Sequence, residues 1–177
     1  REGDTVRLHT PAGEEQLDDR ARKTLLDAND ELARTGLRVL AVAFGHVSEP
    51  SESKLGGLTF SGFIGLADPP APGVKDTIAR LRSAGLRTVM LTGDQRLTAE
   101  AIGREIGLLG AAERVVEGRD LELMSSEELA ATVGSAAVFS RITPEHKLRI
   151  VTALQARGAI VAMLGDGVND APALRKA

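Results

Sequence analysis

The sequence is poor in the residue types that supply much of protein chemistry. Its 177 residues include no cysteine, tryptophan or tyrosine and only four phenylalanines. The lack of cysteine excludes disulfides and thiolate catalysis, and it fits a reducing compartment. Because large aromatic rings are so few, any core must be built mainly from aliphatic side chains.

Two further absences concern partners. Lys and Arg number 22 against 25 Asp and Glu, for a net charge of −3, so no concentrated basic surface suggests nucleic acid as a partner. No apolar run approaches the roughly 20 residues that span a bilayer, and no signal peptide follows Arg1. The remaining composition is typical of one ordinary domain with a small appendage.

Apolar patterning predicts a regular alternation of strands and helices. Such alternation implies right-handed crossovers and a mainly parallel sheet flanked by helices, which is a Rossmann-like α/β fold. A Ser-, Glu- and Gly-rich stretch before residue 58 separates this domain (58–177) from a small N-terminal α+β remnant (1–57). The predicted strands are 38–44, 58–66, 87–91, 114–116, 138–140 and 159–164, and the predicted helices are 18–35, 74–84, 98–106, 125–133 and 144–156.

The most informative segment is 163–174, Met-Leu-Gly-Asp-Gly-Val-Asn-Asp-Ala-Pro-Ala-Leu. It places Asp166, Asn169 and Asp170 at the end of the last predicted strand. Hard oxygen ligands at the carboxyl end of a parallel strand suit a hydrated divalent ion such as Mg²⁺. The alternative, a polar turn in which Asp170 caps the next helix, explains one acid but not all three side chains.

Other predicted strands end in polar residues at the same sheet edge. Asp68 follows one strand, and Thr92-Gly93-Asp94 follows another. Lys147 lies in the first turns of the helix that opens at Pro144. A hydroxyl, an ammonium and paired acids with a metal suit phosphoryl transfer. Taken singly, Asp68 could begin a turn, Thr92-Gly93-Asp94 could be a turn with a helix cap, and Lys147 could be a solvated lysine. Their occurrence together, in this order along the chain, favours the functional interpretation.

The three histidines give no second site. His9, His46 and His146 are far apart in sequence and lack metal-ligand spacing. We expect His146 to lie at the surface.

These motifs resemble those of a known family. Thr92-Gly93-Asp94 with Thr98-Ala99, then Pro144-Glu145-His146-Lys147, then segment 165–174 are similar to the phosphorylation domain of P-type cation-transporting ATPases. That domain is haloacid-dehalogenase-like. Asp68-Pro69-Pro70 resembles the family's hinge, and residues 36–41 resemble the end of its nucleotide-binding domain. The double proline and Arg38 are closer to calcium, sodium/potassium and proton pumps than to heavy-metal pumps.

The resemblance implies specific roles and partners. Asp166 and Asp170 would bind Mg²⁺, and Asn169 would orient the site. Lys147 would contact an aspartyl phosphate, and Thr92 and Gly93 would bind the transferring phosphoryl group. Arg38, Asp68 and Asp94 would border ATP. The parent would be a multi-pass pump, at the plasma membrane, that moves a cation bound within its membrane domain, with this segment on the cytoplasmic side.

One departure bears on activity. The family's phosphorylated aspartate lies in Asp-Lys-Thr-Gly-Thr, and this sequence contains neither that motif nor any Asp-x-Asp. We therefore expect an inactive piece of a pump, cut at both ends. Two alternatives stay open: a stand-alone phosphatase of the same superfamily, and a non-catalytic module that binds Mg²⁺ or phosphate.

The missing strand has a physical consequence. In the family it lies between the strands that end near Leu91 and Leu164. Without it, those strands must pair with each other, with N-terminal residues or with another molecule, because bare strand edges template association. We expect marginal stability or self-association.

Overall fold

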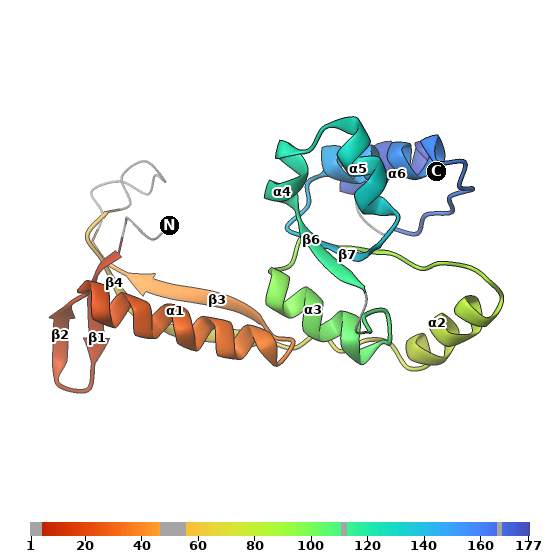
Figure 1. Ribbon diagram of the computed structural model, residues 1–177. Coiled ribbons are helices and arrows are strands. Elements are labelled where there is room, and N and C mark those ends of the chain that lie inside the picture. Colours follow the sequence, from red (N-terminus) through yellow and green to blue (C-terminus); the bar gives the residue numbers. More distant parts are fainter. Residues whose placement is uncertain (1–4, 47–55, 111–112, 166–167) are drawn as a thin grey trace. The chain divides into compact units, whose positions relative to one another are not determined.

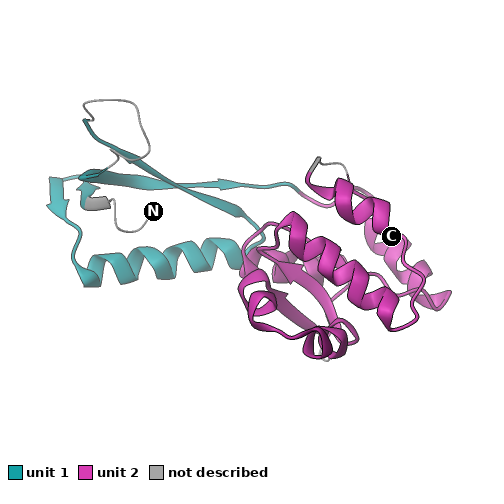
Figure 2. Ribbon diagram, turned by 90° about the horizontal axis from the view of Figure 1, so that it is seen from above, with its two compact units in different colours: residues 1–68 teal, residues 69–177 magenta. Residues whose placement is uncertain are grey.

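The computed structural model describes residues 5–46, 56–110, 113–165 and 168–177. They form two compact units, residues 1–68 and 69–177, coloured separately in Figure 2. Among the described residues, no helix is long and apolar enough to cross a membrane.

The first unit is one helix with a four-stranded mixed sheet in the order β2-β1-β4-β3. Figure 1 shows α1 running along this sheet. Asp18 caps the helix by accepting a hydrogen bond from the Ala21 backbone N–H. The elements are β1 (Thr5–Thr10), β2 (Gly13–Gln16), α1 (Asp19–Arg34), β3 (Arg38–Phe44) and β4 (Leu58–Leu66).

Strand β4 belongs to this first sheet. It pairs antiparallel with β3 and parallel with β1. The boundary expected from the sequence, between residues 57 and 58, therefore precedes β4, whereas the compact units divide after Asp68. The short hairpin of β1 and β2 was not predicted, since its residues are polar and β2 is exposed along its length.

The second unit is a parallel sheet flanked by helices, as predicted. The strand order is β5-β7-β6, and both pairings are parallel. The elements are α2 (Val74–Ser83), β5 (Met90–Leu91), α3 (Arg96–Glu105), β6 (Arg114–Glu117), α4 (Gly118–Leu123), α5 (Ser126–Val133), β7 (Ala136–Ser140), α6 (Pro144–Ala156), the 3₁₀ turn η3 (Val168–Asp170) and α7 (Ala171–Lys176).

The core lies on both faces of β7, whose five residues are all buried. Phe139 packs in one cluster with Val133 of α5 and Ile150 of α6. Val138 faces the other way and packs with Ala99 of α3. Alternate residues of a strand point to opposite faces, so β7 is covered on both sides by helices. The hydrophobic clusters of this unit are aliphatic apart from Phe139 among its described residues, as the composition predicts.

One predicted strand is absent from the structure. Residues 159–164 form no strand, and Ile160 and Leu164 are almost fully exposed. A strand needs a neighbour to accept its backbone hydrogen bonds, and among the described residues β5 pairs only with β7. The prediction of a strand at 159–164 is therefore wrong for this structure: its apolar pattern suits burial, but no described strand pairs with it.

Candidate functional site

The centre of the candidate site is a charged hydrogen bond between Lys147 and Asp170. Lys147 Nζ lies 2.5 Å from Asp170 Oδ1, and the two side chains are only 15% and 9% exposed. The bond joins α6 to the turn that opens α7, across 23 positions of sequence. Burying a charge is costly, so two opposite charges this well shielded from water stabilise each other only when they lie close together.

The start of α6 is fixed by reciprocal capping. The Thr143 hydroxyl accepts from the His146 backbone N–H at 3.4 Å, and His146 Nδ1 accepts from the Thr143 backbone N–H at 3.2 Å. Pro144 occupies the first helical position, which needs no N–H. This cap sets the orientation of the turn that carries Lys147.

The expectation that His146 lies at the surface is wrong. His146 is 6% exposed, with Nε2 at 3.6 Å from Glu122 Oε1. Its ring is buried because it serves as the second half of the cap. This role is hard to predict from sequence, because Glu or Gln usually fills the third helical position of such a capping box.

Asp170 sits against a glycine that leaves room for its carboxylate. A Cβ added to Gly165 would lie 2.5 Å from Asp170 Oδ2 and 2.8 Å from Asp170 Cβ. Only glycine therefore permits this approach. Its role is to make space for the carboxylate.

The loop after β5 is tied to the loop after β7. The Thr92 hydroxyl donates to Asp94 Oδ2 at 2.8 Å and accepts from the Asp94 backbone N–H at 3.1 Å. The backbone N–H of Arg141 donates to Asp94 O, and that of Ile142 donates to Thr92 O. The loop that leads into α6 is thus anchored to Thr92 and Asp94.

Two residues that sequence reasoning missed shape this second loop. Arg141 has a φ of 51°, in the left-handed region that non-glycine residues rarely occupy. Gly118 is buried beneath it, and a Cβ there would collide with Arg141 O. A glycine directly after a strand was the only available signal, and glycines are too common for that signal to be specific.

The remaining predicted site residues are more scattered. Asn169 is exposed, next to Asp170, and Gly93 is exposed in the loop after β5. Arg38 and Asp68 are exposed and belong to the first unit. Asp166 lies outside the described residues. The structure therefore brings together Lys147 and Asp170, and separately anchors Thr92 and Asp94 to the chain entering α6.

The side chains that the structure describes at this site include oxygen ligands of the type that a hard divalent ion prefers. Asp170 contributes a buried carboxylate, and Asn169 beside it offers an amide oxygen; both are ligand types that Mg²⁺ accepts. No cluster of three or more acidic, His or Cys side chains suited to a metal occurs within the described ranges, which omit Asp166.

A comparison with models of known protein families agrees with the fold and motifs described above. The model of the haloacid dehalogenase-like hydrolases matches residues 2–177, so the chain belongs to that family.

Its relatives are cation pumps. The chain is 46% identical over 165 residues to calcium-transporting ATPase 1 of Yarrowia lipolytica, covering 91% of this chain and 18% of that protein. It is 46% identical to human calcium-transporting ATPase type 2C member 2 (88% and 16%) and to the calcium-transporting ATPase of Bacillus subtilis (82% and 17%). The predicted resemblance to P-type cation-transporting ATPases is confirmed; the chain spans less than a fifth of the length of these relatives.

Proposed function

We propose that this chain acts within an ATP-driven cation pump of a membrane, as most of its phosphorylation domain plus the end of its nucleotide-binding domain. The full protein would transfer phosphate from ATP to an aspartate and then hydrolyse the aspartyl phosphate. Calcium is the first candidate for the transported cation, because the similar proteins named above are calcium-transporting ATPases.

The observation that carries this proposal is the buried bond between Lys147 and Asp170. A purely structural ion pair could also join α6 and α7. That alternative does not explain why the chain entering α6, the helix that carries Lys147, is bonded to Thr92 and Asp94 at the carboxyl end of β5. Ligands of open α/β sheets bind at this edge.

The proposed chemistry assigns each group one task. Lys147 neutralises negative charge on the phosphoryl oxygens, and the Gly93 amide donates a hydrogen bond to them. The Thr92 hydroxyl, which donates to Asp94 in the unliganded structure, would turn to donate to the phosphoryl group instead. Asp166 and Asp170 would hold Mg²⁺, which when bound supplies electrostatic stabilisation of the phosphoryl group. Asn169 would orient these ligands, and the hydrogen bond from Lys147 holds the Asp170 carboxylate in place.

We further propose that three residues of this chain border the ATP of the parent pump. Arg38 would reach its phosphates, with Asp68 and Asp94 along the nucleotide. The nucleophilic aspartate would come from another part of the parent pump, since no Asp-x-Asp or Asp-Lys-Thr-Gly-Thr occurs here. The parent would cross the membrane with this segment on the cytoplasmic side.

Two experiments separate the proposal from its alternatives. Reading the gene in both directions should reveal an Asp-Lys-Thr-Gly-Thr motif and apolar membrane spans if the pump assignment is right. The 177-residue chain should give no turnover of a generic phosphate ester such as p-nitrophenyl phosphate. Sustained Mg²⁺-dependent turnover, lost in Asp170→Asn, would instead support a stand-alone phosphatase.

A further inference from the structure

A cavity lies at the opposite end of the parallel sheet from Lys147 and Asp170. Its volume is about 360 Å³, near the lower end of the range of about 300–1,000 Å³ typical of small-molecule pockets. It is bordered by Thr88 before β5, Glu113 before β6 and Ser135 before β7. The site at the carboxyl ends of these strands does not use it.

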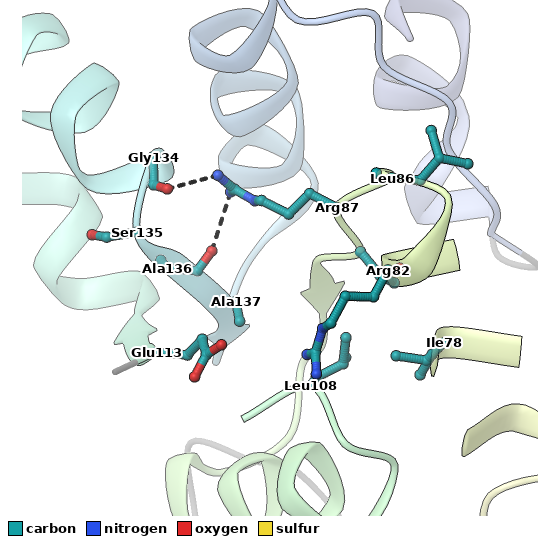
Figure 3. Close-up of a pocket in the computed structure, with 12 residues that line it drawn as sticks. Ile78, Arg82, Leu86, Arg87, Leu108, Glu113, Gly134, Ser135, Ala136 and Ala137 are labelled. Atoms are coloured by element: carbon teal, nitrogen blue, oxygen red, sulfur yellow. Dashed lines mark hydrogen bonds between the residues drawn. The ribbon is translucent and has the colours of Figure 1, made fainter. Parts of the chain in front are cut away.

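The cavity combines an apolar floor with positive charge. Ile78 of α2, Leu108 and Ala137 provide the apolar part, and Leu86 forms an exposed rim. Arg82 and Arg87 line it from α2 and from the segment that follows α2, as Figure 3 shows. Such a lining suits a ligand with an apolar body and one charged end.

The two guanidinium groups bond to carbonyl oxygens. Arg82 Nη2 donates to Gly107 O at 2.8 Å. Arg87 donates to Gly134 O at 2.8 Å and to Ala136 O at 3.3 Å (Figure 3). It also donates to Val133 O. Neither Arg82 nor Arg87 forms an ion pair with another described residue.

The lining of the cavity carries more positive than negative charge. Burial, and then the positive charge of Arg157, lowers the pKa of Arg87 below its usual value. Arg157 itself donates to Ala130 O. Glu113 supplies one carboxylate to the cavity lining, and that carboxylate also accepts from the Gly110 backbone N–H. Two arginines against one glutamate leave the lining with a net positive charge.

We propose that this cavity binds a small anionic amphiphile: a short aliphatic body seated against Ile78 and Leu108, with a carboxylate or phosphate head held by Arg82. Arg82 is the better anchor because it makes one carbonyl bond and has donors left. Arg87 has three carbonyl partners and mainly supplies charge.

The test uses the whole 177-residue chain, ¹⁵N-labelled, titrated with octanoate, octyl phosphate, 1-octanol and acetate. Octanoate or octyl phosphate should shift the amides of Leu86, Leu108 and Ser135. Either should bind at least about tenfold more tightly than 1-octanol or acetate, because a charge-assisted hydrogen bond adds to apolar burial. Which anion binds better identifies the head group.

Variants test the assigned contacts. Arg82→Gln should weaken octanoate binding at least about tenfold, while Arg80→Gln, an exposed arginine of α2 outside the lining, should leave it unchanged. Glu113→Gln should strengthen it about two- to fivefold by removing a like charge. If Arg82→Gln does not fold, Leu86→Ser, at an exposed rim position, should still weaken binding. Equal affinity for octanoate and 1-octanol, or no shift at these amides, would overturn the proposal.

Discussion

Lys147 and Asp170, 23 residues apart in sequence, meet in a 2.5 Å charged hydrogen bond that is largely shielded from water. Removing one partner leaves the other charge buried and unpaired. We expect Lys147→Met to lower the free energy of unfolding by about 3 kcal/mol, the lower end of the range for broken buried pairs. Urea denaturation measures this directly.

A double-mutant cycle separates the energy of the interaction between Lys147 and Asp170 from the effect of changing each side chain alone. Lys147→Met with Asp170→Asn should cost clearly less than the sum of the two single changes. Glu100→Gln, which breaks the exposed pair with Arg104, should cost under about 1 kcal/mol. Additive costs at 147 and 170 would show that the two residues do not interact in solution.

Gly165→Ala tests the space beside Asp170. Its Cβ would lie 2.5 Å from Asp170 Oδ2, so the carboxylate must move and Mg²⁺ binding should weaken. Calorimetric titration with Mg²⁺ measures the effect. Gly62→Ala, where a Cβ meets nothing within 4 Å, is the matched control. Unchanged Mg²⁺ affinity in Gly165→Ala would mean that the observed carboxylate position is not the binding one.

Gly118→Ala tests the support of the loop that enters α6. The new Cβ would collide with Arg141 O, and the bonds from this loop to Asp94 and Thr92 should be strained. We expect a lower melting temperature and altered amide shifts at Thr92 and Asp94. Shifts restricted to α4, with Thr92 and Asp94 unmoved, would argue against this coupling.

Glu145 should make stability depend on pH in the acid range. Its own backbone N–H, and then the Thr143 hydroxyl, lower the pKa of its carboxyl. A carboxyl with a lowered pKa stabilises the folded state above its unfolded-state pKa, and this contribution is lost as pH falls through the folded-state pKa. The stability difference between the native chain and Glu145→Gln should therefore be present at pH 7 and shrink below about pH 4.3. A difference that grows toward low pH would contradict the assigned cause.

The exposed side chains of Ile160 and Leu164 predict self-association. They are 103% and 98% exposed, in the segment that was expected to be a strand. Ile160→Glu with Leu164→Glu should reduce association in concentration-dependent light scattering. Leu123→Glu, at another exposed leucine (87%), should have little effect. A native chain that stays monomeric at all concentrations would count against the prediction.

Local signals predicted the parts of the fold that local chemistry controls. The helix predicted over 125–133 is present as α5, and Ser125 and Glu128 form a capping box at its start. The parallel β5-β7-β6 sheet follows from alternating strands and helices. Strand partners are different, because pairing is not local. Nothing within residues 58–66 shows that they pair with β3, and nothing within 159–164 shows that no partner is available.

The site was predictable where residue type alone carries the chemistry. The charged pair of Lys147 and Asp170 joins two motifs that the sequence analysis predicts to be functional. The buried role of His146 and the support of Arg141 by Gly118 depend on close packing between separate elements. Such packing has no signature in a single sequence.

The most direct test of the central claim is one amide spectrum of the ¹⁵N-labelled chain, titrated first with Mg²⁺ and then with inorganic phosphate. If the proposed site exists, Mg²⁺ shifts Gly165 and Asp170, and phosphate then shifts Thr92, Gly93 and Lys147 together. Asp166→Ala should abolish both steps. Phosphate shifts that leave Thr92 and Lys147 unmoved while Mg²⁺ binds elsewhere would contradict a shared phosphoryl site.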